Sequence, residues 1–145
     1  MKKTALLIML FLFLAAFGAC EKEPEARSTV FAFIKKLYSD REIKLDEYCD
    51  LDELVRQSDS SVYVYNSTIS ISENIDRFAR LFEPEGKIRR LWTSKRIVVG
   101  EAEVLRDTAY VEVTFIDDDS GLYSYNRMGL KRTDEGWLIF AFKLL

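Results

Sequence analysis

The chain has 145 residues, 48% of them hydrophobic and 31% charged, and its net charge is −3. This length is that of one domain with a single hydrophobic core. A net acidic chain is a poor candidate for nucleic-acid binding, which depends on neutralising phosphates, so no nucleic-acid partner is expected. The sequence contains no histidine, which excludes Ser-His-Asp and Cys-His catalysis and histidine-ligated zinc.

The first twenty residues are organised like a bacterial export signal. Two lysines follow the initial methionine, and an uncharged, mostly apolar run occupies 4–17. Gly18 and Ala19 then precede Cys20, after which the chain becomes highly charged. Small residues at a processing site are typical of export signals, and the cysteine at that site makes this one resemble the signal of a bacterial lipoprotein.

The resemblance implies that 1–19 are a signal peptide, that Cys20 carries a palmitate-type acyl anchor, and that 20–27 hold this cysteine and a short polar tether. The protein is then expected in the cell envelope, held by its lipid on the periplasmic side of a membrane. Glu21 stands where an aspartate would favour the inner membrane, and this favours the outer membrane. Ordinary secretory cleavage and an uncleaved anchor are the alternatives.

The first half of the domain predicts helices. Ser28 or Thr29 begins a helix whose apolar residues recur at helical spacing. Asp50, with Glu53 three residues later, is a capping-box pattern and predicts a second, shorter helix. The apolar faces are Val30, Phe31, Ile34, Leu37 and Tyr38 in the first helix, and Leu51, Leu54 and Val55 in the second.

The next segment predicts a short strand, a third helix and a basic loop. Val62–Tyr65 alternates as a strand does, and a helix from Ser72 ends before Pro84. The basic stretch over 87–96 is interpreted as a solvated loop and strand start, with a surface for anionic headgroups as the alternative. The apolar face of the third helix is Ile75, Phe78, Ala79 and Phe82, and the basic residues are Lys87, Arg89, Arg90, Lys95 and Arg96.

From Trp92 onward, four strand-like runs joined by hairpin-length connections predict an antiparallel meander. In the first hairpin, pairing Leu105 with Thr108 aligns the apolar residues of both strands on one face. The runs are Ile97–Leu105, Thr108–Ile116, Leu122–Lys131 and Trp137–Leu144. The core face of the first hairpin is Ala102, Val104, Ala109, Val111, Val113 and Phe115, and the outer face carries Glu101, Glu103 and Glu112.

This order of elements resembles the nuclear-transport-factor-two-like superfamily, the cystatin-like cone shared with ketosteroid isomerase. The ending over 131–139, a charged turn followed by Gly136, Trp137 and alternating apolar residues, strengthens the resemblance. It implies a single α+β domain over 28–145, with N-terminal helices packed on a curved antiparallel meander. Enzymes of this superfamily keep an acid or base inside the cone, whereas the strand glutamates here fall on the outer face.

One predicted site lies inside the cone, the default pocket of such a fold. If 117–120 is a four-residue loop, the core face continues through Leu122, Ser124, Asn126 and Met128. Ser124 and Asn126 would then be polar groups in an apolar cup that orient a small, mostly apolar ligand. Alternatively, the polar groups bond to backbone or water, or another loop length turns them outward. The pattern does not determine the strand register after Phe115.

A second predicted site lies on the opposite face of the sheet. The same register places Tyr110, Tyr123 and Tyr125 there, with Phe140 and Phe142 as further members. An exposed aromatic face predicts a contact surface for a homodimer or for an envelope protein partner. The alternative is that the C-terminus or a helix covers these rings.

No cofactor and no metal site are expected. The turn over 117–121 contains three aspartates but lacks the spacing and closing glutamate of an EF-hand, and is typical of a solvated hairpin turn. With Cys20 acylated, Cys49 is the remaining cysteine, so no internal disulfide can form. Cys49 is interpreted as a buried small apolar residue, and a reactive or cross-linking thiol is the alternative.

Together these observations predict a membrane-anchored envelope lipoprotein whose non-enzymatic accessory domain binds a small apolar ligand or a protein partner. One alternative is a cone-fold isomerase or hydrolase that works without histidine. The other is an inhibitor or assembly factor that acts through the aromatic sheet face.

Overall fold

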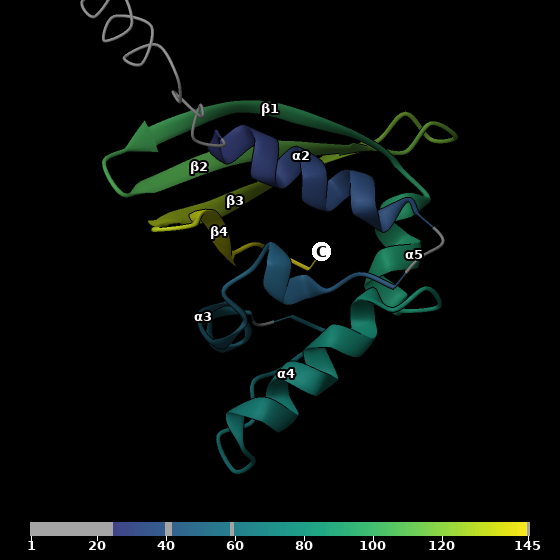
Figure 1. Ribbon diagram of the computed structural model, residues 1–145. Helices are drawn as coiled ribbons and strands as arrows, with labels where there is room; N and C mark the ends of the chain where they lie inside the picture. The colour runs from purple at the N-terminus through teal and green to yellow at the C-terminus, as the bar shows by residue number, and fades with distance from the viewer. Residues whose placement is uncertain (1–24, 40–41, 59, 145) are drawn as a thin grey trace, which may run out of the picture.

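A curved four-stranded antiparallel sheet with helices packed against one face forms the domain (Figure 1). The computed structural model describes residues 25–39, 42–58 and 60–144, so the predicted signal peptide and Cys20 lie outside the described residues. The predicted α+β architecture is confirmed. The strands, in spatial order, are β1 (Arg96–Leu105), β2 (Thr108–Ile116), β3 (Tyr123–Thr133) and β4 (Gly136–Ala141). The helices are α2 (Ala26–Leu37), α3 (Leu51–Gln57), α4 (Ile71–Ala79) and α5 (Lys87–Thr93), with 3₁₀ turns at Leu45–Glu47 and Arg80–Phe82.

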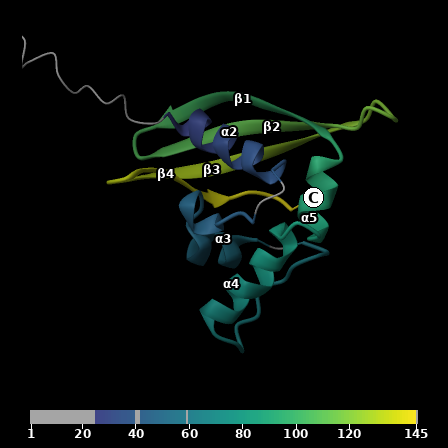
Figure 2. The same ribbon diagram turned by 45° about the vertical axis from the view of Figure 1, so that its right-hand side comes forward.

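Helix α2 lies along β1 and β2, whereas α3 packs against β4 and α4 lies farthest from the sheet (Figure 2). Helix α2 begins at Ala26, so the predicted start at Ser28 or Thr29 was wrong. The Glu25 carbonyl already accepts hydrogen bonds from the backbone N–H groups of Ser28 and Thr29, at 2.9 and 3.3 Å. Ala26 is buried, so the core continues one turn further toward the N-terminus than the apolar pattern indicated.

The N-cap predicted for α3 is confirmed, but the reciprocal half of the capping box does not form, because the Asp50 backbone N–H donates to the Ile139 carbonyl at 2.9 Å. The Asp50 side chain accepts a hydrogen bond from the Glu53 backbone N–H at 3.1 Å. The carboxylates of Asp50 and Glu53 also form ion pairs with Lys131 of β3, whose Nζ lies 2.5 Å from Asp50 and 2.9 Å from Glu53. One lysine therefore fastens the N-terminus of a short helix to the sheet.

The prediction of a strand over 62–65 was wrong, because this segment adds no strand to the sheet and Val64 is its single bridge residue. Tyr63 is instead buried, edge-on to Phe78 of α4, with ring centroids 5.2 Å apart. Helix α4 begins at Ile71, one residue before the predicted Ser72, because Ser70 is the N-cap and its hydroxyl accepts from the Glu73 backbone N–H at 3.1 Å.

Helix α5 was missed, because its basic residues were interpreted as a solvated loop. Arg89 is buried, and its guanidinium donates to the backbone carbonyls of Leu37, Ser39 and Phe82. Leu37 and Ser39 lie at the end of α2, and Phe82 ends the 3₁₀ turn that follows α4. Helix ends leave backbone carbonyls without a partner in the helix. The cation therefore belongs to the interior, and its neighbours Ile88 and Trp92 are fully buried.

The predicted register of the first hairpin is confirmed from Leu105↔Thr108 to Ala102↔Val111. A β-bulge follows, because Val99 pairs with Val113 and two residues of β1 then oppose Glu112. A side chain on Gly100, one of the two, would meet the Glu112 carbonyl oxygen at 3.0 Å. The bulge bends β1 and keeps Val99 on the core face. In the second hairpin Phe115 pairs with Ser124, Val113 with Asn126 and Val111 with Met128. The connection therefore has six residues, 117–122, and the predicted four-residue loop was wrong. Because the difference is two residues, Ser124, Asn126 and Met128 stay on the predicted core face, whereas Leu122 lies in the loop and is exposed.

A second irregularity corrects the prediction for the last strand. Leu130 pairs with Ile139 but Gly129 pairs with Ala141, so Phe140 is an extra residue. This reverses the alternation, and Phe142, predicted on the outer face, is buried in the core. Phe140 remains outside and its ring covers Gly129, where an added Cβ would lie 3.0 Å from the ring.

Aromatic side chains occupy the space between the helices and the sheet. Phe33 of α2 and Trp92 of α5 are fully buried and meet edge-on, with ring centroids 6.4 Å apart. Phe142 lies 5.4 Å from Trp92 and 6.0 Å from Phe33. Other rings in this cluster are Phe78, Phe82 and Phe115. The helices are therefore held on the sheet by rings from both layers.

We expect Lys131→Met to lower the free energy of unfolding by about 1 kcal/mol, because it leaves the partly buried Asp50 and Glu53 without their cation. Burial alone would raise the pKa of Asp50, but the hydrogen bonds from Lys131 and from the Glu53 backbone hold it below its ordinary 3.8. A lowered pKa stabilises the fold above that ordinary value, and this stabilisation disappears as the pH falls through the lowered one.

The difference between wild type and variant should therefore be complete near pH 7 and disappear below about pH 4. Urea unfolding at a series of pH values measures it. Lys87→Met, at an exposed position with no recorded ion pair among the described residues, is the control. An equal loss in both variants, or a loss that persists in acid, would contradict the role of Lys131.

Candidate functional site

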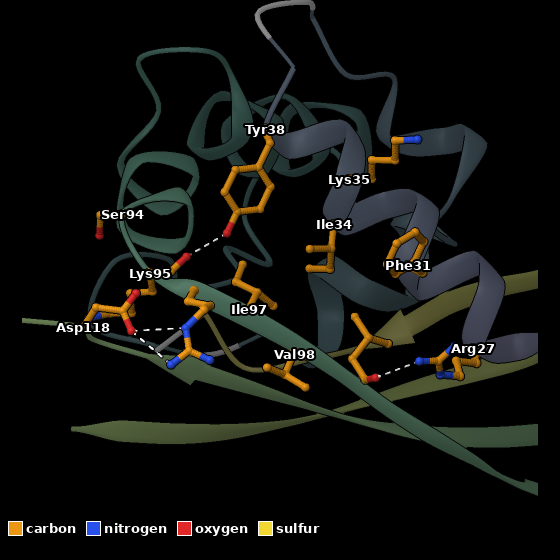
Figure 3. A pocket seen from close by; sticks show the side chains of 12 residues that line it. Arg27, Phe31, Ile34, Lys35, Tyr38, Ser94, Lys95, Ile97, Val98 and Asp118 are labelled. Carbon is orange, nitrogen blue, oxygen red and sulfur yellow. Dashed lines mark hydrogen bonds and ion pairs between the residues drawn. The ribbon is translucent and has the colours of Figure 1, made fainter. Parts of the chain in front are cut away.

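An open groove of about 800 Å³ runs between α2 and β1 (Figure 3). We call it the α2–β1 groove. Its floor is apolar, with Ile34 from the helix and Ile97 and Val99 from the strand. Its volume lies within the range of small-molecule sites.

The helix wall of the groove is a stripe of α2 separate from the core face. Arg27, Phe31 and Lys35 are four residues apart and therefore lie above one another on one side of the helix. Phe31 is 54% exposed, and Tyr38 on the next stripe is 48% exposed. Both were predicted as core residues, and in the structure both line the groove.

The strand wall of the groove is the edge of the sheet, since β1 pairs only with β2 among the described strands. Arg27 donates from Nε to the Gly100 carbonyl at 3.0 Å and from Nη2 to the Val99 carbonyl at 3.2 Å. At the other end, the Tyr38 hydroxyl donates to the Lys95 carbonyl at 2.7 Å. Burial raises the pKa of Tyr38, so its hydroxyl keeps its proton at neutral pH. Side chains from α2 and its C-cap thus cover the strand edge at both ends of the groove.

Cations outnumber acids around the groove. Arg96 pairs with Asp118 at 3.1 Å, and Lys95 pairs with Asp117 at 3.1 Å. The backbone N–H of Ser120 and then Lys95 bond to Asp117 and lower its pKa to about 2, so this pair is charged at every physiological pH. The two ion pairs join the start of β1 to the β2–β3 turn and close that end of the groove.

The site predicted inside the cone is brought together only in part. Ser124, Asn126 and Met128 share the core face as expected, but Asn126 and Met128 are fully buried. The Asn126 amide donates to the Lys143 carbonyl at 2.6 Å, and its oxygen accepts from the Lys143 N–H at 3.0 Å. Asn126 therefore joins β3 to the C-terminal segment and leaves no exposed atom for a ligand.

The predicted tyrosine face exists on the outer side of the sheet. Tyr123 and Tyr125 are 64% and 56% exposed and meet edge-on, with ring centroids 5.5 Å apart. Tyr110 is half-buried beneath the Arg127 guanidinium, which lies 4.3 Å from its ring centroid. Nothing in the described structure covers the Tyr123–Tyr125 pair.

The described residues include no buried carboxylate, since the buried polar residues there are Ser58, Asn74, Arg89 and Asn126. Glu101, Glu103 and Glu112 are exposed, as predicted. No three acidic or cysteine side chains of the described chain cluster as metal ligands do.

Cys49 is buried, as interpreted from the sequence. Burial, and then the nearby Asp50, raise the pKa of its thiol well above the ordinary value, so the reactive thiolate is scarce in the folded protein.

The groove was missed because Phe31 and Tyr38 were assigned to the core face of α2, whereas Phe33, which lies in the core, was left out of that face. The signal was nevertheless present, in that Phe31 stands four residues from a cation on either side. A core-facing stripe seldom carries charges at both ends.

Neither a family model nor a curated protein matches this chain. Similar solved structures include the de novo designed NTF2 fold protein NT-9, with a TM-score of 0.54, 16% identity and coverage of 86% of each chain. A designed NTF2 protein with a long sheet, Rd1NTF2_04, has a TM-score of 0.52 and 16% identity over 82% of this chain and 98% of its own. A putative NTF2-like transpeptidase from Campylobacter jejuni has a TM-score of 0.42 and 21% identity over 74% of this chain and 90% of its own.

The domain therefore has an NTF2-like fold, in agreement with the expected superfamily fold. At these identities the similarity shows the fold alone. Among the helices that the structure describes, none combines the length and the hydrophobicity needed to cross a bilayer.

Proposed function

We propose that this protein is a lipid-anchored component of the bacterial cell envelope whose NTF2-like domain binds a small, mostly apolar ligand without transforming it. The observation that carries the proposal is the α2–β1 groove, an open space of about 800 Å³ with an apolar floor and a polar rim. Ligand sites commonly combine such a floor with a few fixed polar groups. The groove replaces the cone interior as the proposed site, because rings and the buried Asn126 occupy that interior.

The covered edge of β1 favours a small ligand over an extended peptide. A peptide that added a strand to this edge would need a row of free backbone groups. The carbonyls of Lys95, Val99 and Gly100 already accept hydrogen bonds from α2 side chains. Along the groove, what remains between them is a window of about three residues, shorter than the usual strand of about five. The strand edge continues over 101–105, outside the groove.

The chemistry of the described residues supports binding rather than catalysis. An isomerase or hydrolase of this fold would need a general acid or base that meets the substrate. The acid that lines the groove, Asp118, is exposed and paired with Arg96, so its carboxylate already has a partner. A cone-fold enzyme without histidine remains the alternative, and it would need turnover by these solvated groups.

The proposed anchor would place the groove beside the membrane. Five residues separate Cys20 from Ala26, and an extended chain of this length reaches at most about 20 Å. Arg27, at one end of the groove, lies in the first turn of α2. An apolar ligand that partitions into the bilayer would therefore meet the groove close to the membrane surface, on the outer membrane in the version that we favour.

The Tyr123–Tyr125 pair favours a second candidate function, contact with a second copy of this chain. Two exposed rings in contact are unusual on a free surface, because aromatic residues are enriched at protein interfaces. This surface lies on the face of the sheet opposite to the helices, so the two functions do not exclude each other.

We expect Phe31→Ser to weaken binding of the uncharged apolar dye Nile red at least about fivefold, because the ring is a large apolar part of the groove wall. The full chain would be held in phosphatidylcholine nanodiscs, and the signal of empty nanodiscs would be subtracted. Tyr123→Ser removes a ring of similar exposure elsewhere and should leave binding unchanged. Equal affinities in wild type and Phe31→Ser would refute the groove as the site.

We expect Cys20→Ser to remove the acyl chains, and with them the membrane attachment. Intact-mass measurement of the protein from bacterial membranes should show the added acyl mass on the wild type and none on the variant. Fractionation should find the wild type in membranes. An uncleaved anchor would instead keep both proteins in the membrane at the unprocessed mass, and secretory cleavage would leave both outside it.

We expect the double variant Tyr123→Ser, Tyr125→Ser to lose a cross-linked dimer that the wild type forms in membranes, because two exposed rings leave the interface. Short amine-reactive cross-linkers and gel electrophoresis provide the measurement, and Phe31→Ser, which changes the other side of the domain, should keep the dimer. A wild type without a dimer, or a dimer that survives both substitutions, would rule out this contact.

A further inference from the structure

We infer that the ligand of the α2–β1 groove is a single-chain aliphatic carboxylate, whose carboxylate meets the Lys35 ammonium and whose chain lies over Phe31, Ile34 and Ile97. This inference rests on the proposed function and adds the chemical class of the ligand. It follows from how the charges around the groove are used.

Most cations of the groove already have partners. Lys95 and Arg96 form ion pairs with Asp117 and Asp118. Arg27 uses Nε and Nη2 on two backbone carbonyls and has Glu101 at 3.8 Å. Their positions are therefore explained by the fold itself.

Lys35 differs from these cations. It is exposed, it lines the groove, and among the described residues its side chain has no hydrogen bond or ion pair. Figure 3 shows this side chain at the rim of the groove, with its nitrogen directed away from Ile34 and Phe31. A lysine stem has four flexible carbons, so the ammonium can turn toward a ligand in the groove. A solvated ammonium next to an apolar wall fits a ligand that is anionic at one end and apolar along its length.

The charges at the ends of the groove restrict the anion to a single negative charge. Asp118 lies at one end and Glu101 faces Arg27 at the other. A phosphate monoester, with nearly two charges and three acceptor oxygens, would need several converging donors, whereas one free ammonium suits one carboxylate. A quaternary ammonium amphiphile would be disfavoured, because the most accessible charge beside the apolar wall is the Lys35 cation.

The length of the stripe suits one acyl chain. Lys35 stands eight positions after Arg27 in α2, which is about 12 Å along the helix. Phe31 stands midway and Ile34 and Ile97 form the floor beneath it. A chain that starts at Lys35 would thus run over apolar side chains until it reaches the Arg27 end.

Three probes of equal chain length separate the ligand class from the groove itself: dodecanoate, dodecanol and dodecyltrimethylammonium. Each is titrated calorimetrically into the full chain in phosphatidylcholine nanodiscs at pH 8, and the heat with empty nanodiscs is subtracted. The matched variants are Lys35→Gln and Lys36→Gln. Both lysines lie in the last turn of α2, where each favours the helix to a similar extent, but Lys35 alone lines the groove.

We expect dodecanoate to bind about five- to tenfold more tightly than dodecanol, and the ammonium probe more weakly than either. Lys35→Gln should reduce dodecanoate to the affinity of dodecanol, whereas Lys36→Gln should keep the preference. Added salt should reduce the preference, because an exposed ion pair is screened.

The other outcomes separate the two proposals. If dodecanoate and dodecanol bind equally and Lys35→Gln changes neither, the groove is an apolar site and the carboxylate inference is wrong. Equal losses in Lys35→Gln and Lys36→Gln, or preference for the ammonium probe, would also overturn it. If no probe binds beyond the empty-nanodisc signal, the proposed function fails as well.

Discussion

The packing of Phe33 against Trp92 and Phe142 is the constraint on which the rest of the domain depends. These rings come from α2, α5 and the segment after β4, and their centroids lie 5.4 to 6.4 Å apart. Together they set the height of α2 above the sheet, because buried rings cannot be compressed. They also occupy the interior where the fold would otherwise hold a ligand. Open space is therefore found beside α2 rather than beneath it.

Two irregular strand positions make this packing possible. The bulge at Gly100 bends β1 toward α2 while Val99 stays on the core face. The extra residue at Phe140 turns Phe142 inward, and without it the cluster would lose a ring. Bulges that re-aim side chains are recurrent devices of curved sheets. Here one shapes the groove wall and the other fills the interior, so both affect where a ligand can go.

Sequence patterns predicted the parts of the fold that depend on local chemistry. The Asp50–Glu53 cap, the Leu105–Thr108 hairpin and the inward register of Asn126 depend on near neighbours or strict alternation, and the structure confirms them. Helix α5 was missed because the burial of Arg89 depends on carbonyls about fifty residues away in α2. Such a partner leaves no trace in local periodicity, and the same holds for the reversal of alternation at Phe140.

The proposed site shows the same limit more clearly. Asn126 was identified as a polar group in an apolar interior, and it is one, but its partner is the Lys143 backbone. A buried amide facing a strand terminus satisfies backbone groups that the sheet leaves unpaired, and nothing in the spacing distinguishes this role from ligand binding.

The α2 residues that line the groove belong to a helix whose two faces make different contacts. One face, with Val30 and Phe33, packs into the core, and the stripe from Arg27 to Lys35 faces β1. Arg27 links these two roles, because its guanidinium holds α2 to the strand edge and at the same time shortens that edge. An uncovered edge strand invites pairing with other chains. By covering this edge at the two ends of the groove, α2 leaves within the groove a space too short for a strand but apolar enough for a small molecule.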